Sequence, residues 1–207
     1  FVGSSLLQAC FTEEDMIGEP NWIVEGGFDR PLAIPPTATG NVQLVSQTIS
    51  DEMLSGKMTS SYSYRNGLSG PTIIASKGET ITVQFQNNLS AESNIHWHGL
   101  ILPENMDGHP KDVYASGSSY NYVLPIQQRA GTYWYHPHPH ERTGPQVNMG
   151  LAGLLIVSDP AERALALPSG DAELVCVLQD RSFDGDNQLR YAANMMEREM
   201  GFTGDVM

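Results

Sequence analysis

Hydrophobic and polar residues alternate with a period of two in several short stretches of this chain. The alternation is regular over residues 80–85 (TITVQF), and it predicts a strand because successive side chains of a strand point to opposite faces. Turn-forming residues, such as those at 65–67 and 69–71, separate the stretches. Further strands are predicted at 41–49, 93–98, 120–125, 131–136, 151–158 and 173–179. We therefore predict an all-β fold, a Greek-key β-sandwich or a small barrel.

The pattern changes on both sides of this strand-rich region. Residues 1–40 have no sustained period and carry three prolines between positions 31 and 36, so we expect an irregular leader. Residues 41–159 form the predicted β domain. Residues 160–207 contain two helix-permissive stretches, 161–170 and 191–200. We expect a short helical connector there that leads into a truncated second domain.

Composition narrows the functional classes. The chain has 207 residues, 40% of them hydrophobic, which suffices for one buried core. The 11 Lys and Arg stand against 24 Asp and Glu, giving a formal charge of −13, so binding to nucleic acid or to an anionic membrane surface is electrostatically unfavourable. No apolar run reaches the roughly 20 residues that a transmembrane helix needs. Small molecules or metal ions are the partners that fit this chain.

The two cysteines indicate no disulfide framework. Cys176 lies inside the apolar run 174–178, where we predict a buried residue that packs within a strand. Cys10 ends the stretch LLQAC, which loosely resembles a bacterial lipoprotein cleavage site, although Gln8 is unusual in such a site. We expect a periplasmic or secreted protein, and a lipidated Cys10 and an ordinary exposed terminus are the open alternatives.

Five of the six histidines fall in two clusters, HWH at 96–98 and HPHPH at 136–140. Residues i and i+2 of a strand project from one face, about 6 to 7 Å apart along the chain. Two such strands packed together would direct four imidazoles to one point, and neutral imidazole binds copper, zinc, iron or nickel. The predicted metal ligands are His96, His98, His136 and His138.

The other histidines and the aromatic neighbours are assigned other roles. A single His-x-His pair arises often by chance, but two pairs with aromatic flanks favour a metal site. His140 follows Pro139 and is expected to leave the strand, and His109 is expected to be an exposed turn residue. Trp97 and Trp134 are expected to pack the strands.

Three motifs carry a family resemblance: NIHWHGL at 94–100, GTYWYHPH at 131–138 and GLAGL at 150–154. Together they resemble the amino-terminal cupredoxin domain of multicopper oxidases, in particular of bacterial three-domain laccases and copper-efflux oxidases. The resemblance covers residues 41–159 and continues weakly through 178–180 and the turn at 184–185. It implies a β-sandwich of the cupredoxin type.

The resemblance also implies copper and a role for each site residue. His96 corresponds to a ligand of the type 2 copper, and His98, His136 and His138 correspond to ligands of the type 3 pair. Asp107 lies where the efflux-oxidase branch has an acid that helps to move protons to oxygen; an Asp-Gly turn that caps its own backbone is the alternative. The implied reaction reduces dioxygen to water with electrons from phenols, aromatic amines or Cu(I).

Two parts of the family's machinery are absent from these 207 residues. Neither cysteine has a histidine near it in sequence, so no type 1 copper site is formed. The two further His-x-His motifs that complete the copper cluster are also missing. We therefore expect a fragment whose parent chain supplies the remaining domains. The fragment alone is expected to bind copper weakly and to have no oxidase activity.

Two other functional classes remain open. One is a non-enzymatic copper-binding or scaffold module, although scaffold relatives tend to lose the histidines and all four are present here. The other is a cupin-type mononuclear metal enzyme, because His96, His98 and Glu104 resemble the two-His-plus-Glu arrangement of cupins. The cupin alternative leaves His136 and His138 without a role.

Overall fold

The computed structural model describes residues 33–65 and 67–204. Most of the expected leader at 1–40 therefore lies outside the described residues, and so does Cys10, whose lipidation stays a prediction. The domain boundaries expected at residues 41 and 160 also remain predictions.

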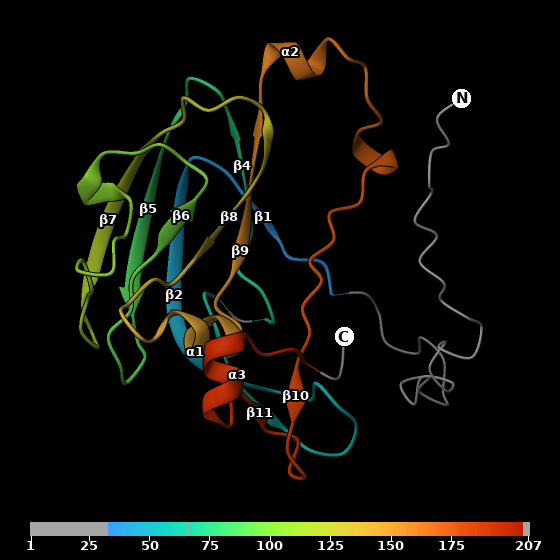
Figure 1. The fold of residues 1–207 in the computed structure, drawn as a ribbon. Helices are drawn as coiled ribbons and strands as arrows, with labels where there is room; N and C mark the ends of the chain where they lie inside the picture. The colour runs from blue at the N-terminus through green and yellow to red at the C-terminus, as the bar shows by residue number, and fades with distance from the viewer. Residues whose placement is uncertain (1–32, 66, 205–207) are drawn as a thin grey trace, which may run out of the picture. The chain divides into compact units, whose positions relative to one another are not determined.

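Two β-sheets form the framework of the described chain (Figure 1). The first has five strands in the order β1-β4-β9-β8-β6, and the second has four in the order β3-β2-β5-β7. The first sheet contains β1 Thr37–Ala38, β4 Thr72–Ser76, β9 Gly153–Ser158, β8 Gly131–His136 and β6 His96–His98. The second contains β3 Thr59–Ser63, β2 Asn41–Asp51, β5 Thr80–Asn87 and β7 Ser119–Pro125. The predicted all-β fold is confirmed.

Aromatic and aliphatic side chains from both sheets form one buried core. Strand β5 shows how the alternating pattern builds it, because Ile81, Val83 and Phe85 are at most 1% exposed and the residues between them point outward. Trp97 and Tyr135, which belong to β6 and β8, are among the largest fully buried side chains. The two histidine-bearing strands are therefore anchored in the core by their inward residues.

The structure corrects two of the predicted strands. The predicted strand at 93–98 is reduced to His96–His98, since Ser93 forms only an isolated bridge with Tyr114. The predicted strand at 173–179 is wrong, because none of its residues is in a strand. No described strand pairs with this segment, so Leu174 and Leu178 remain 65% and 77% exposed. Cys176 is also exposed, and the prediction of a buried, strand-packing thiol is wrong.

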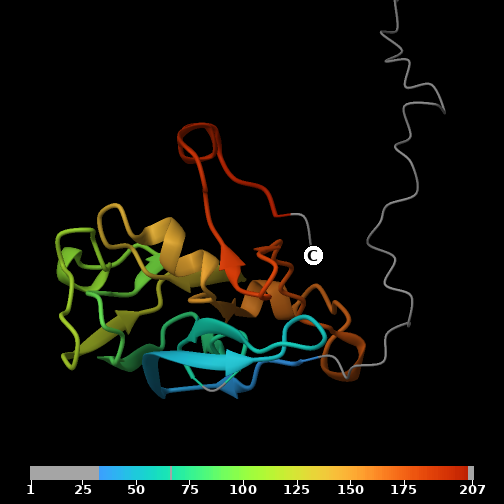
Figure 2. The same cartoon turned by 90° about the horizontal axis from the view of Figure 1, so that it is seen from below.

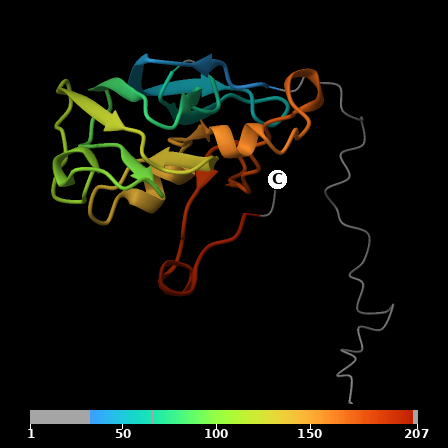
Figure 3. The same cartoon turned by 90° about the horizontal axis from the view of Figure 1, so that it is seen from above.

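Short helices and one hairpin complete the described chain. The helices are η2 Glu104–Met106, α1 Thr143–Asn148, α2 Pro160–Arg163, η3 Gly170–Ala172 and α3 Met195–Met200, and the hairpin is β10 Ser182–Phe183 with β11 Leu189–Arg190. Helix α2 overlaps the predicted stretch 161–170 at its start, and helix α3 falls within the predicted stretch 191–200. In Figures 2 and 3 the red segment that carries α3 extends away from the two sheets. Across the described ranges, every helix is too short or too polar to cross a bilayer.

Candidate metal centre

The antiparallel pairing of β6 with β8 sets which side chains share a face of the sheet. The register places three pairs opposite each other: His96 with His136, Trp97 with Tyr135, and His98 with Trp134. Trp97 and Tyr135 point into the core, where both are fully buried. Because side chains alternate along a strand, the three histidines and Trp134 lie on the opposite face.

Tyr135 fixes β8 from the core side. Its hydroxyl donates a hydrogen bond of 2.7 Å to the backbone oxygen of Pro71, and its ring centroid lies 5.5 Å from that of Trp97. A Cβ atom at Gly70 or Gly153 would collide with the Tyr135 side chain, so both positions need glycine. Through Gly153, the GLAGL motif at 150–154 therefore packs against Tyr135 of β8.

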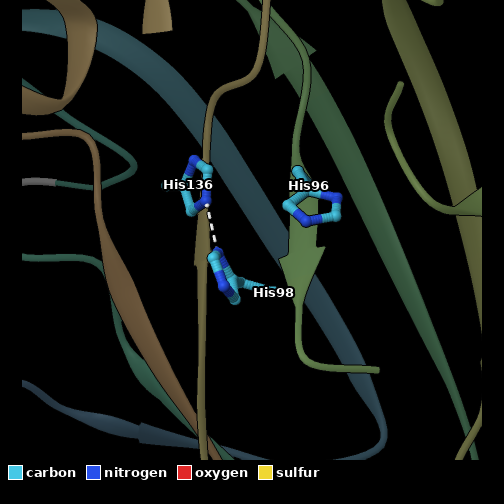
Figure 4. Close-up of side chains that lie close together, drawn as sticks. All are labelled: His96, His98 and His136. Carbon is cyan, nitrogen blue, oxygen red and sulfur yellow. Dashed lines mark hydrogen bonds between the residues drawn. The ribbon is translucent and has the colours of Figure 1, made fainter. Parts of the chain in front are cut away.

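The imidazoles meet on the outer face of β6 and β8 (Figure 4). One ring nitrogen each of His96, His98 and His136 lies within 4.8 Å of the other two. His138 follows β8, and its ring centroid is 5.2 Å from that of His96 and 5.9 Å from that of His136. The structure thus brings the four predicted ligands together, although they come from two separate parts of the chain.

Backbone carbonyl groups orient two of the rings. Nδ1 of His96 lies 2.7 Å from the backbone oxygen of Asp107, and Nδ1 of His136 lies 2.8 Å from the backbone oxygen of Pro137. A carbonyl oxygen only accepts, so both Nδ1 atoms carry the hydrogen, and in the neutral form of each ring Nε2 holds the lone pair. Nε2 of His136 accepts a hydrogen bond of 3.1 Å from Nδ1 of His98, the dashed line in Figure 4. A metal ion at Nε2 would replace this hydrogen bond.

Burial keeps the His136 ring neutral. His136 is only 4% exposed, and its desolvation is the main cause that lowers its pKa from 6.5 to about 4. The hydrogen bond to Pro137 opposes this shift, and the three neighbouring imidazoles add to it. At neutral pH the ring is therefore in the form that binds a metal ion.

Comparison with known proteins decides the family. The multicopper oxidase family model matches residues 46–162, more than half of the chain. The chain belongs to the multicopper oxidase family. The multicopper oxidase mco of Staphylococcus aureus is 34% identical to it over 164 residues, which are 79% of this chain and 36% of that protein.

Two solved multicopper oxidases show the same fold. McoA of Aquifex aeolicus matches with a TM-score of 0.75 and 38% identity, over 85% of this chain and 40% of that one. The laccase-like CueO of Ochrobactrum sp. matches with a TM-score of 0.76 and 34% identity, over 84% of this chain and 40% of that one. The cupredoxin-type fold is therefore confirmed. The chain spans about two fifths of the length of these relatives.

The donor set of this multicopper oxidase domain fits the copper that its family implies. The cluster offers neutral imidazole nitrogens, which bind copper readily. In the neutral form of His96 and His136, Nε2 holds the lone pair, because Nδ1 donates its hydrogen to a backbone oxygen. Nδ1 of His138 is buried and has no hydrogen-bond partner among the described residues. Such an unpaired buried nitrogen costs free energy, and coordination of a metal ion would remove that cost.

Trp134 departs from the expected packing role. It lies on the histidine face and not in the core, and its ring stacks on His98 with centroids 5.0 Å apart and an interplanar angle of 26°. The centroid of the same indole is 4.2 Å from that of His136. Trp97 does pack in the core as predicted. The indole of Trp134 therefore covers one side of the histidine cluster, because Trp134 alternates along β8 with the inward Tyr135.

Asp107 lies beside the histidines of the multicopper oxidase domain. Its Oδ1 atom is 3.5 Å from Nδ1 of His96, is buried, and has no hydrogen-bond partner among the residues that the structure describes. Oδ1 therefore caps no backbone amide among the described residues. Its Oδ2 atom is 3.8 Å from Nε2 of His109, so His109 borders the site through this carboxylate.

The remaining candidates lie apart from the cluster. The side chain of His140 is 83% exposed and is 3.8 Å from Glu141. Glu104 forms an ion pair of 3.1 Å with Lys111, so it does not complete a cupin-type site, and the cupin alternative is wrong.

The sequence did not reveal two residues of the centre. The sequence predicts a packing role for Trp134, and it marks Asn94 only as the first residue of the NIHWHGL motif. Asn94 is fully buried and forms hydrogen bonds to several segments around the histidines. Its place next to the HWH motif is the one signal in the sequence that points to it.

Proposed function

We propose that His96, His98, His136 and His138 supply half of the histidine ligands of a trinuclear copper cluster that reduces dioxygen to water. The observation that carries the proposal is the convergence of these rings, with three ring nitrogens within 4.8 Å of one another. The bonds from Nδ1 of His96 and His136 to backbone oxygens leave Nε2 of both rings available as a ligand atom.

The assignment of individual rings follows the family. His96 would hold the type 2 copper, and the other three histidines would hold the type 3 pair. The second half of the ligands and the type 1 copper would come from further domains of the parent chain. The lengths of the relatives support this, because the chain covers 36% of the staphylococcal oxidase and 40% of each solved structure.

The bound copper would supply the single-electron transfers that dioxygen reduction requires. The domain's own residues would hold and orient the imidazoles and exclude water from one side of them through Trp134. Asp107 would carry protons toward oxygen on Oδ1, the buried atom that lies 3.5 Å from Nδ1 of His96. The electrons would come from phenols, aromatic amines or Cu(I), and the parent protein would act in the periplasm or outside the cell.

Copper titration of the metal-free chain tests this proposal. We expect weak Cu(II) binding that His96→Ala and His136→Ala each reduce by about tenfold or more. The matched control is His140→Ala, since this histidine is 83% exposed and lies outside the cluster. We also expect no oxygen uptake when the isolated chain is mixed with a phenolic dye and copper. Binding that depends on His140 and not on His96, or oxygen uptake by the chain alone, would contradict the proposal.

A copper-binding module without oxidase chemistry is the second candidate. It is favoured by the close approach of His96, His98 and His136, because three imidazoles can hold one ion within a single domain. The coding sequence that follows Met207 distinguishes the two functions. A His-Cys-His stretch with another histidine a few residues later is expected for the oxidase and not for the module.

A further inference from the structure

The carboxamide of Asn94 connects the segments that carry the histidines. Asn94 is fully buried. Its Oδ1 atom accepts a hydrogen bond of 2.7 Å from the backbone N–H of His138. Its Nδ2 atom lies 3.1 Å, 2.9 Å and 3.1 Å from the backbone oxygens of Gly108, His109 and Asp112. One side chain thus links the end of the second histidine motif to the 107–112 loop.

The same loop holds the His96 ring. Nδ1 of His96 donates its hydrogen to the backbone oxygen of Asp107, at 2.7 Å. Asp107 directly precedes the residues whose carbonyl oxygens Nδ2 of Asn94 binds. A displacement of the loop would therefore remove the acceptor of His96 and free the ring to rotate or to change tautomer.

Gly108 shows independently that the 107–112 loop lies close to the strand that carries His96. Its φ of +69° favours glycine, and a Cβ atom there would collide with the backbone oxygen of Ile95. The loop therefore lies directly against the residue that precedes His96. The close approach brings the carbonyl groups of the loop within reach of Asn94.

We infer that Asn94 is a positioning residue for copper, whose carboxamide sets the place of His138 and, through the 107–112 loop, the orientation of His96. This inference rests on the proposed function of these histidines as copper ligands. The Asn94 carboxamide accepts a hydrogen bond from one backbone N–H and shares its two hydrogens among three backbone carbonyl oxygens. An apolar side chain of the same volume could form none of these hydrogen bonds.

The first test needs no substitution and no copper. In the wild-type chain, NMR should show the carboxamide protons of Asn94 protected from solvent exchange and the His96 ring as one tautomer with its hydrogen on Nδ1. Rapid exchange of the carboxamide protons, or a mixture of His96 tautomers, would overturn the inference whether or not the chain binds copper.

The second test compares Asn94→Ala with Ser93→Ala. Ser93 is the matched control, because it is also fully buried and donates a hydrogen bond of 2.8 Å to Oε1 of Gln146, which belongs to α1 and not to the 107–112 loop. We expect Asn94→Ala to lose the single tautomer of His96 and to bind Cu(II) about tenfold or more weakly. We expect Ser93→Ala to lower the melting temperature without either effect. Wild-type tautomer and affinity in Asn94→Ala, or equal losses in Ser93→Ala, would overturn the inference.

Gly108→Ala tests whether the position of the 107–112 loop controls the His96 ring. This variant provides the test if Asn94→Ala does not fold. The added Cβ should push the loop from Ile95 and produce the same loss of the His96 tautomer. An unchanged His96 ring in folded Gly108→Ala would contradict the inference. If the wild-type chain binds no copper, the proposed function fails, and the tautomer of His96 still reports on the role of Asn94.

Discussion

His96 and His136 face each other across the antiparallel pair β6–β8, with their ring centroids 5.3 Å apart. The two residues are 40 positions apart in the sequence, so the pairing register alone makes them neighbours. A slip of one residue would turn every side chain of β6 to the other face. The register is held from the core side, where Trp97 lies opposite Tyr135.

Gly153→Ala should weaken this core-side anchor. The added Cβ would collide with the Tyr135 ring, and the ring is fully buried, so it has little space in which to move. We expect the free energy of unfolding to fall by about 1–3 kcal/mol, the usual cost of overpacking a core. Urea unfolding measures the change. Gly185→Ala is the control, because a Cβ there meets no atom within 4 Å, and equal losses in both variants would refute this explanation.

Tyr135→Phe should leave the backbone oxygen of Pro71 without its hydrogen bond of 2.7 Å. The bond is buried, so we expect a loss of about 1–3 kcal/mol in the free energy of unfolding. Tyr133→Phe removes a similar bond of 3.0 Å to Arg129 at an exposed site, where water can replace the hydroxyl. Thermal or urea unfolding should therefore show a smaller effect for Tyr133→Phe, and the reverse order would contradict the prediction.

Trp134→Ala should raise the pKa of His136. Burial is the main cause of the low value of about 4, and the indole centroid lies only 4.2 Å from the imidazole centroid. Removing the indole admits water to the ring and moves the pKa toward 6.5. NMR titration of the copper-free chain measures it. Trp134→Phe keeps an aromatic cover, so its pKa should stay nearer the wild-type value; a wild-type value in Trp134→Ala would disprove the role of the indole.

The low pKa of His136 should make the copper-free chain less stable in mild acid. Between pH 6.5 and about 4 the unfolded chain binds a proton at this ring and the folded chain does not. Protonation therefore favours unfolding, and the free energy of unfolding falls as the pH falls through this range. Below about pH 4 the folded ring also binds the proton, so His136 no longer makes the free energy of unfolding change with pH.

His136→Gln isolates this contribution, because glutamine does not titrate. Urea unfolding at about pH 7.5 and about pH 5 should show a larger loss of stability in the wild-type chain than in His136→Gln. Equal losses in the two proteins would show that His136 is already protonated in the folded chain at the lower pH.

Local sequence patterns predicted most of the individual strands, because the pattern of a strand depends only on its own residues. The alternation over 80–85 matches the inward Ile81, Val83 and Phe85 of β5. The strand predicted from the continuous apolar run at 174–178 was wrong, and Leu174 and Leu178 of that run stay exposed among the described residues. A local apolar pattern shows that a segment can pair in a sheet, but it does not show whether a partner strand is present.

The spacing within HWH was enough to predict that His96 and His98 share a face, since the period of a strand is a local property. His138 lies beyond the end of β8, so its place beside the other rings does not follow from that period. Whether the two motifs meet depended on the pairing of β6 with β8, which joins residues far apart in the chain. The stacking of Trp134 and the hydrogen bonds of Asn94 also arise from such distant contacts. They became visible only in the folded chain, because no short stretch of sequence contains both partners.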